Sequence, residues 1–406
     1  MQHTGRVDYA TIGLLLVSGL GLVSALLSAV SLGLFGLVSV FGEVVPLGDT
    51  VPIFTIAWIS ALVGLLALPA VVLCVLRLLG RVPHLPNFLN GWRLASILML
   101  LWPLVLVAGN AIAGSSRLAW LLLPPLHLLA IGLPLWWLVE LARKSLPGGS
   151  TQRGWGILNT SLFVTTPTLI VVELLAIIGL LVLVGVAVSL RPEWLAVFER
   201  LAERLALLQE DPTAVMQVLQ PILENPLAIY AVLAVLAGLV PLVEELFKPL
   251  AVWFLAGWSL SPAEGFVAGA ISGGGFALLE SLLTLSGPQG DGWAALAVAR
   301  AGTGLLHITT TALMGWALAS AWRNGAYWRL GLAYLLAVVW HGMWNGLSVA
   351  SGVDVLFTTP PAEIAWLMRL SAVAPFGLLV LVISLFLFLW GGNRRLRGST
   401  LVEPAL

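Results

Sequence analysis

Two glutamates and a lysine lie close together in a stretch that is otherwise as apolar as a membrane span. Glu244, Glu245 and Lys248 belong to the sequence PLVEELFKPL, inside an apolar run from Pro226 to Gly257. A charged side chain at the centre of a membrane helix costs roughly 2.5–3.5 kcal/mol on insertion scales. Three charges so close together therefore need a compensating role, and we interpret that role as chemistry.

Each of the next three apolar segments carries a pair of residues at a spacing that places both on one helix face. The pairs are Phe276 and Glu280, Arg300 and His307, and His341 and Asn345. Three glycines, residues 273–275, precede the first pair. Glycines at membrane depth allow another helix to approach closely, or they allow the helix to break where protein or water surrounds it.

Carboxylates and imidazoles in these positions could hydrolyse a peptide bond. Hydrolysis needs an activated water, stabilisation of charge on the carbonyl oxygen and a proton for the leaving amine. A buried carboxylate next to another carboxylate is expected to be a better base than one in water, so we expect Glu244 to be the general base. Glu280 or His307 would complete the water site. Lys248 would hold Glu244 or Glu245 in place, and Glu244 and Lys248 have the i, i+4 spacing of a helical ion pair.

The same residue types are metal ligands. Glutamate and histidine suit zinc, and three protein ligands plus water would make a catalytic site. The candidate ligands are Glu244, Glu280, His307 and His341. Because the chain has no H-E-x-x-H pair, we favour a site without tightly bound metal, and one divalent ion such as zinc is the alternative.

Composition indicates the elements that must position these residues. The chain is 60% hydrophobic and 9% charged, and its net charge of zero gives no indication of a nucleic-acid partner. Apolar runs of about 20 residues or more, enough to cross a bilayer, recur along the chain. The predicted fold is all-α, a polytopic membrane protein with about ten transmembrane helices. The expected spans are 11–41, 52–79, 92–113, 118–139, 157–190, 226–257, 263–286, 293–321, 327–350 and 364–391.

The placement of ionisable residues divides the chain into four parts. Residues 1–190 form an N-terminal membrane region of unassigned role, and residues 226–350 form the chemically dense core. Residues 351–406 contain the last span and a basic tail. Residues 191–225 alternate charges with apolar residues at helical spacing, which predicts an amphipathic segment on the outer membrane surface.

The distribution of Lys and Arg predicts the orientation in the membrane. Basic residues lie in the loops near residues 80, 145 and 325 and in the C-terminal tail. The alternate loops, residues 42–51, 287–292 and 351–363, carry acids and no Lys or Arg. Both termini of this multi-pass cell-membrane protein are therefore predicted to be cytoplasmic.

Four motifs follow one another on separate predicted spans. They are E-E-x-x-K at 244–248, F-x-x-x-E at 276–280, a histidine at 307 and H-x-x-x-N at 341–345. Over Pro226–Ala350 these resemble the motifs of PrsW-type intramembrane proteases. That family is related to the CAAX prenyl endopeptidases and the bacteriocin-processing and immunity proteins, which have E-E-x-x-x-R and F-x-x-x-H instead. Lys248 and Glu280 depart from that wider pattern in the way the PrsW branch does.

The resemblance implies a prokaryotic membrane protease that cleaves membrane-anchored proteins. Some PrsW members are linked to cleavage of anti-sigma factors, which makes an anti-sigma factor a candidate partner. The relation to the prenyl endopeptidases implies that His341 and Asn345 donate hydrogen bonds to the oxyanion. Those relatives are described both as glutamate-type and as metal-dependent enzymes.

Other functions fit some of the same residues. A proton- or ion-coupled transporter also uses buried Glu, His and Lys. Transporters often have inverted repeats, however, and no such repeat is seen here, because the dense set of ionisable residues lies in the second half. A CAAX-type prenyl endopeptidase-like protein is a closer alternative. An inactive scaffold would have lost a motif position, and none is lost.

Overall fold

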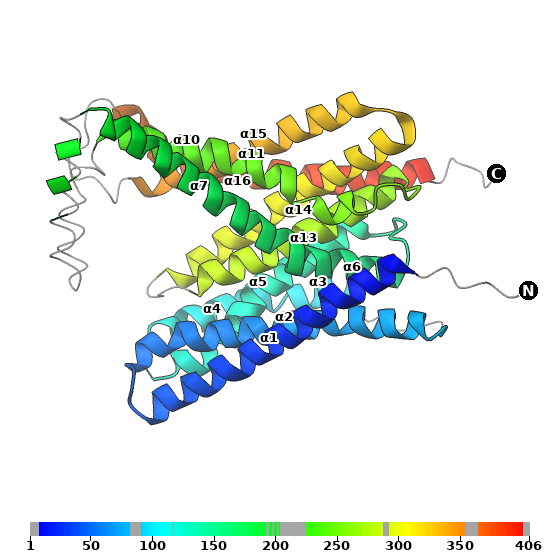
Figure 1. Cartoon of the computed structure of the whole chain (residues 1–406), viewed down its shortest axis with the longest axis horizontal. Coiled ribbons are helices and arrows are strands. Elements are labelled where there is room, and N and C mark those ends of the chain that lie inside the picture. The colour runs from blue at the N-terminus through cyan, green and yellow to red at the C-terminus, as the bar shows by residue number, and fades with distance from the viewer. Residues whose placement is uncertain are drawn as a thin grey trace, which may run out of the picture. The chain divides into compact units, whose positions relative to one another are not determined.

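The structure is a computed structural model that describes residues 8–81, 91–115, 117–191, 195–196, 199–200, 203, 225–286, 292–353 and 364–400. Every regular element in these ranges is helical (Figure 1), which confirms the all-α prediction. The amphipathic segment predicted at 191–225 lies almost wholly outside the described residues.

The long helices coincide with the predicted spans to within a few residues, except at the extended ends of α5, α6 and α16. Their bounds are α1 Tyr9–Phe41, α2 Val51–Leu78, α3 Trp92–Met99, α4 Trp102–Ala113, α5 Ala119–Arg143, α6 Thr151–Thr160, α7 Thr166–Ser189, α10 Pro226–Ala234, α11 Val240–Phe247, α12 Leu250–Trp253, α13 Pro262–Leu285, α14 Trp293–Asn324, α15 Tyr327–Gly352 and α16 Ala365–Thr400. Within the described residues, eight spans are long and apolar enough to cross a membrane, and α3 and α4, bent by 42°, form a ninth candidate. The predicted count of ten is therefore approximate.

The chain divides into two compact units. Unit 1 consists of Met1–Pro167, Glu245–Ala337 and Val382–Leu406, and unit 2 of Thr168–Glu244 and Val338–Leu381. The divisions fall within helices α7, α11, α15 and α16 rather than in loops.

Helix α13 packs closely against α14 in unit 1. Glycines at every fourth position of α13 face the backbone of α14, where an added Cβ would collide with a carbonyl group. The facing residues are Gly265 with Gly315, Gly269 with Thr311, and Gly273 with His307. Small residues at this spacing let two membrane helices approach backbone to backbone. This close contact fixes which residues of α13 lie beside His307.

Helix α14 is the predicted span that is not among the candidate membrane helices. Its residues 303–315 are all buried, and they include four threonines or histidines in the run His307–Thr311. Because neighbouring helices rather than lipid cover this helix, it can carry polar side chains without exposing them to hydrocarbon.

The glycine run 273–275 does not break α13, which continues from Pro262 to Leu285. Each glycine faces a different neighbour in unit 1: Gly273 the carbonyl of His307, Gly274 the side chain of Val139, and Gly275 the side chain of Ser161. Of the two roles predicted for these glycines, the structure therefore confirms close approach.

Two π-helical turns interrupt the spans, each two residues before a proline. Ser161–Thr165 precedes Pro167, and Val235–Leu239 precedes Pro241. In the second turn the N–H of Val240 donates to the carbonyl of Val235. A π turn inserts one extra residue into a helix and is frequent at functional sites.

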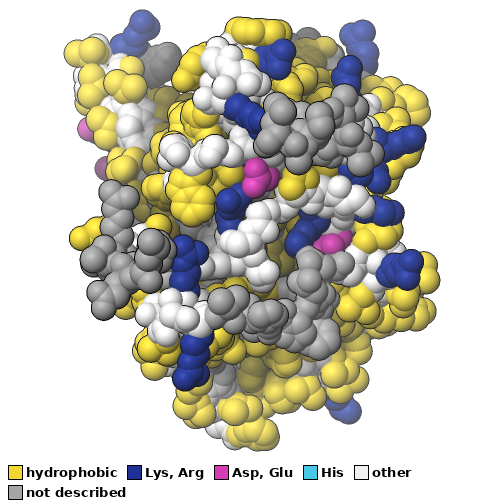
Figure 2. Space-filling view, turned by 90° about the vertical axis from the view of Figure 1, so that its right-hand side faces the viewer, with side chains coloured by type: hydrophobic (Ala, Val, Ile, Leu, Met, Phe, Trp, Pro, Cys, Tyr) yellow, Lys and Arg dark blue, Asp and Glu magenta, His cyan; other side chains and the backbone are white. Residues whose placement is uncertain are grey.

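The basic helix ends of unit 1 meet at one face. Arg77 at the end of α2 pairs with Asp8 at 2.8 Å and donates to Gln152 of α6 at 3.0 Å. Asn393 of α16 donates to the carbonyls of Ala142 and Lys144, at 2.8 and 2.9 Å. Figure 2 shows many Lys and Arg side chains on this face and few acidic ones. These basic helix ends therefore lie together within unit 1, and the orientation of this face in the membrane stays a prediction.

Candidate active site

Glu280 and His307 are brought together by the α13–α14 contact. Their Oε2 and Nε2 atoms lie 2.7 Å apart, two helical turns beyond the close approach at Gly273. The ring of Phe276, one turn before Glu280, stands edge-on to the His307 ring with centroids 5.0 Å apart. The two positions of the F-x-x-x-E motif therefore both contact the histidine.

Arg300 completes the surroundings of Glu280. Its Nη2 atom lies 2.7 Å from Oε2 of Glu280, and its Nε donates to Oγ of Ser281 at 3.2 Å. Glu280 keeps 31% of its side-chain surface exposed, whereas Arg300 keeps 12%. Glu280 and Arg300 therefore form an ion pair at the edge of the network.

Lys248 links Glu245 to His307. The fully buried ammonium lies 2.8 Å from Oε1 of Glu245 and 2.7 Å from Nδ1 of His307. A lysine ammonium only donates, so Nδ1 of His307 must be an acceptor. The proton of the neutral ring is then on Nε2, where it is donated to Glu280. These contacts fix one tautomer of His307.

The position of Lys248 depends on a break in its own span. Helix α11 ends at Phe247 and α12 begins at Leu250, so Lys248 lies in the turn between them. Its carbonyl accepts from Oγ of Ser272 at 2.8 Å. This break changes the i, i+4 geometry expected for Lys248. Within unit 1 its ammonium forms an ion pair with Glu245, one of the two partners expected for it.

Two serines support this turn, and the sequence analysis missed both. Ser272 of α13 donates to Lys248, and the carbonyl of Ser272 accepts from Oγ of Ser161 at 2.7 Å. Both serines are fully buried. The sequence does show both serines inside apolar spans, one of them directly before the triple glycine. A serine hydroxyl in such a span commonly bonds to backbone groups, and this could have indicated their role.

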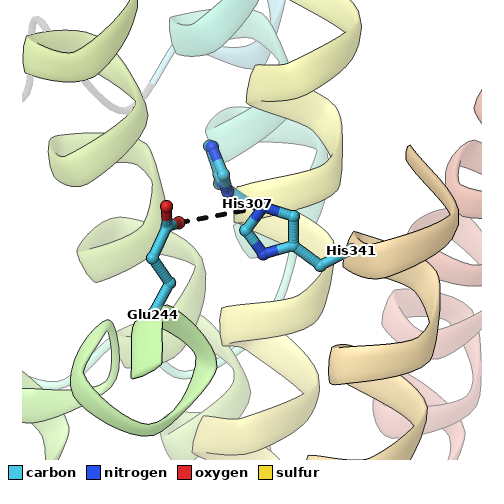
Figure 3. A group of neighbouring side chains, drawn as sticks. All are labelled: Glu244, His307 and His341. Atoms are coloured by element: carbon cyan, nitrogen blue, oxygen red, sulfur yellow. Dashed lines mark ion pairs between the residues drawn. The ribbon is translucent and has the colours of Figure 1, made fainter. Parts of the chain in front are cut away.

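Unit 2 brings Glu244 and His341 together. Oε2 of Glu244 lies 3.9 Å from Nε2 of His341, and both side chains are buried. Figure 3 shows Glu244 on α11 and His341 on α15 directed toward each other, with the dashed line marking this pair. Asn345, one turn after His341, donates through Nδ2 to the carbonyl of Leu236 at 2.8 Å.

The predicted site residues therefore form one network within each unit. In unit 1 the network is Glu245, Lys248, Phe276, Glu280, Arg300 and His307. In unit 2 it is Glu244, His341 and Asn345 with Leu236.

The model of the PrsW family intramembrane metalloproteases matches residues 167–388, more than half of the chain. The chain belongs to this family. No curated protein and no solved structure matches it. The match extends beyond 226–350 on both sides, into α7 and α16. This PrsW-family protein is therefore a peptidase of the membrane whose substrates are membrane-embedded proteins, and the transporter alternative is set aside.

The PrsW-family chain also has a group that could hold a metal. Among the described residues, Glu244, His307 and His341 form a carboxylate and two imidazoles that could bind one ion (Figure 3). This donor set is of the kind that binds zinc at catalytic sites. Together with the family's description as metalloproteases, it favours the metal-dependent alternative over the site without metal that we had favoured. Glu280, the fourth candidate ligand, contacts His307 instead.

Proposed function

We propose that this PrsW-family peptidase cleaves membrane-anchored proteins with one divalent metal ion, such as zinc, held by Glu244, His307 and His341. The observation that carries the proposal is the hydrogen bond from Nε2 of His307 to Glu280 at 2.7 Å. A histidine that binds a metal through one nitrogen commonly donates its other N–H to a carboxylate.

The surroundings of His307 fit this role. Since Nε2 carries the proton, Nδ1 has the lone pair that a metal would need. That lone pair accepts from Lys248, which also lies 2.8 Å from Glu245. If Lys248 turns away from His307, its ammonium keeps the Glu245 carboxylate as a partner. His307 can therefore offer Nδ1 to a cation without leaving a buried charge unpaired.

The residues around the ligands orient them. A metal bound here would supply the positive charge that polarises the scissile carbonyl and makes water a better nucleophile. Arg300 holds the Glu280 carboxylate, and Glu280 in turn fixes the ring of His307. Within unit 2, Glu244 on α11 and His341 on α15 lie 3.9 Å apart. Burial of this set excludes bulk water, so a nucleophilic water must enter with the substrate or through a polar path.

A mechanism without metal assigns other roles to the same residues. Glu244 would then take the proton from the attacking water as general base, and its contact with His341 at 3.9 Å supports that pairing. His341 and Asn345 would hold the developing oxyanion, as the related prenyl endopeptidases suggest. The two mechanisms differ in whether Glu244 is needed for metal binding.

The substrate must open its own helix. A membrane-spanning helix hides its peptide bonds in hydrogen bonds, so the cleaved segment must unwind, and Gly or Pro near the cut would make this easier. We propose a substrate with one span that contains such residues. An anti-sigma factor is the partner that family resemblance suggests.

Elemental analysis of the purified protein tests the proposal. We expect zinc in the wild-type protein and its loss in Glu244→Gln, His307→Gln and His341→Gln. The control is His127→Gln. His127 is also a buried histidine, but it is not one of the three proposed ligands, and its Nε2 accepts a hydrogen bond from Trp293 at 3.0 Å. Thermal unfolding of each variant identifies those that have simply misfolded.

Cleavage is measured in parallel in proteoliposomes with a single-span reporter protein that contains a central Gly-Pro pair. Chelation should abolish cleavage and added zinc should restore it. Full cleavage by metal-free protein, with cleavage lost in Glu244→Gln, would reject the metal and support the general-base mechanism.

A further inference from the structure

Pro241 has no N–H to donate to the carbonyls of its own span. In an α-helix its missing N–H would have bonded the carbonyl of Ala237, and in the π turn it would have bonded the carbonyl of Leu236. The N–H of Val240, the α-helical donor for Leu236, is given to Val235 instead. The carbonyl of Leu236 therefore needs a donor from outside the helix.

Asn345 supplies that donor from α15. Its Nδ2 lies 2.8 Å from the carbonyl oxygen of Leu236. On α15, one turn before Asn345, Gly342 lies so close to the carbonyl oxygen of Ala237 that an added Cβ would collide with it. Both carbonyls thus face α15, which also carries His341 one turn before Asn345.

The part of the span before the π turn is anchored separately. Tyr230 of α10 stacks on Trp366, with ring centroids 6.3 Å apart, and accepts a hydrogen bond from its indole at 3.2 Å. Ile229 packs in a buried apolar cluster with residues of α15 and α16. The rotation of α10 is therefore fixed within unit 2 by contacts that do not involve the glutamates.

The π turn then decides which residue of α11 faces His341. One extra residue in the turn changes the rotation of everything after it by about 100°, because an α-helix advances 100° per residue. If the turn relaxed to α-helix, the position now held by Glu244 relative to α10 would be taken by Val243. The contact of 3.9 Å between Glu244 and His341 depends on the turn being kept.

We propose that Asn345 is a positioning residue that holds this π turn, and through it directs Glu244 rather than Val243 toward His341 (Figure 3). This differs from an oxyanion donor, because the amide acts on the backbone of α10–α11 and not on substrate. The inference rests on the proposed function only in taking Glu244 and His341 as site residues.

Thiol cross-linking tests this register without reference to metal or activity. Two cysteine pairs, Glu244→Cys with His341→Cys and Val243→Cys with His341→Cys, are built in a Cys74→Ala protein and treated with a short bifunctional thiol reagent. With Asn345 present, only the first pair should cross-link. Asn345→Leu should abolish the first cross-link and produce the second. Asn345→Asp, which keeps the size but loses the donor, should do the same.

A regularised helix provides the rescue. Deletion of Gly238, whose Cβ position contacts nothing within 4 Å, removes the extra residue, and Pro241→Ala restores the missing N–H. In this background Asn345→Leu should leave the first cross-link intact. Asn345→Leu should also keep zinc binding in a regularised helix that retains Glu244 and His341. An unchanged first cross-link in Asn345→Leu of the original chain, or failure of the regularised helix to restore it, overturns the inference. Absence of zinc from the wild-type protein, with the cross-links as expected, would reject the proposed function alone.

Discussion

Replacement of Lys248 by methionine tests the buried network most directly. Lys248 and Glu245 have no exposed side-chain surface and lie 2.8 Å apart. Removal of one partner of a buried ion pair takes away the interaction that offset the burial of the other charge, which destabilises proteins by about 3–5 kcal/mol. We therefore expect Lys248→Met to lower the free energy of unfolding by about that amount. The double variant Glu245→Gln with Lys248→Met removes both charges of this pair and should recover most of the loss.

The assay is equilibrium unfolding in mixed micelles, followed by the fluorescence of the 18 tryptophans. Arg77→Met is the control, because Arg77 forms its ion pair with Asp8 at an exposed position, with 52% and 32% of the side chains accessible. Exposed pairs contribute about 0–1 kcal/mol. The reasoning is refuted if Lys248→Met destabilises no more than this control, or if the double variant is no more stable than the single one.

Three other outcomes follow from the structure. Gly273→Ala should force α13 from α14 and cost about 1–3 kcal/mol by overpacking, whereas Gly132→Ala, with nothing within 4 Å of its Cβ position, should be neutral in the same unfolding assay. Burial raises the pKa of Asp8, but hydrogen bonds from Thr11 and the charge of Arg77 outweigh burial and hold the pKa below its usual value. The small stabilising contribution of the Asp8 carboxylate should be complete at neutral pH and disappear as pH falls through that lowered pKa. Unfolding curves of Asp8→Asn should not show this loss. Reporter fusions should place both termini in the cytoplasm, and labelling of either from outside intact cells would reverse the predicted orientation.

Local sequence was sufficient to predict the class of the protein and to single out candidate residues for its site. Apolar runs specify membrane helices because each run must satisfy its own backbone inside the bilayer, and that requirement is local. Glu244, Glu280, His307 and His341 were recognisable because a charge or imidazole at membrane depth needs a reason. The order of the motifs then indicated the family that the match at 167–388 shows.

The partners of those residues could not be predicted from their spacing. Ideal helical geometry paired Lys248 with Glu244 as readily as with Glu245, but a break after Phe247 and support from Ser272 direct the ammonium to Glu245 and His307. The tautomer of His307 follows from those contacts.

Sequence determined that this chain is a helical membrane protein and which side chains it can use for chemistry, because both depend on the cost of each residue in lipid. Tertiary structure decided how the side chains pair, because pairing depends on the rotation and closeness of helices that are far apart in the chain. Gly273 sets the closeness of α13 to α14, and the π turn before Pro241 sets the rotation of Glu244. Asn345 holds that turn from a helix about a hundred residues away in sequence.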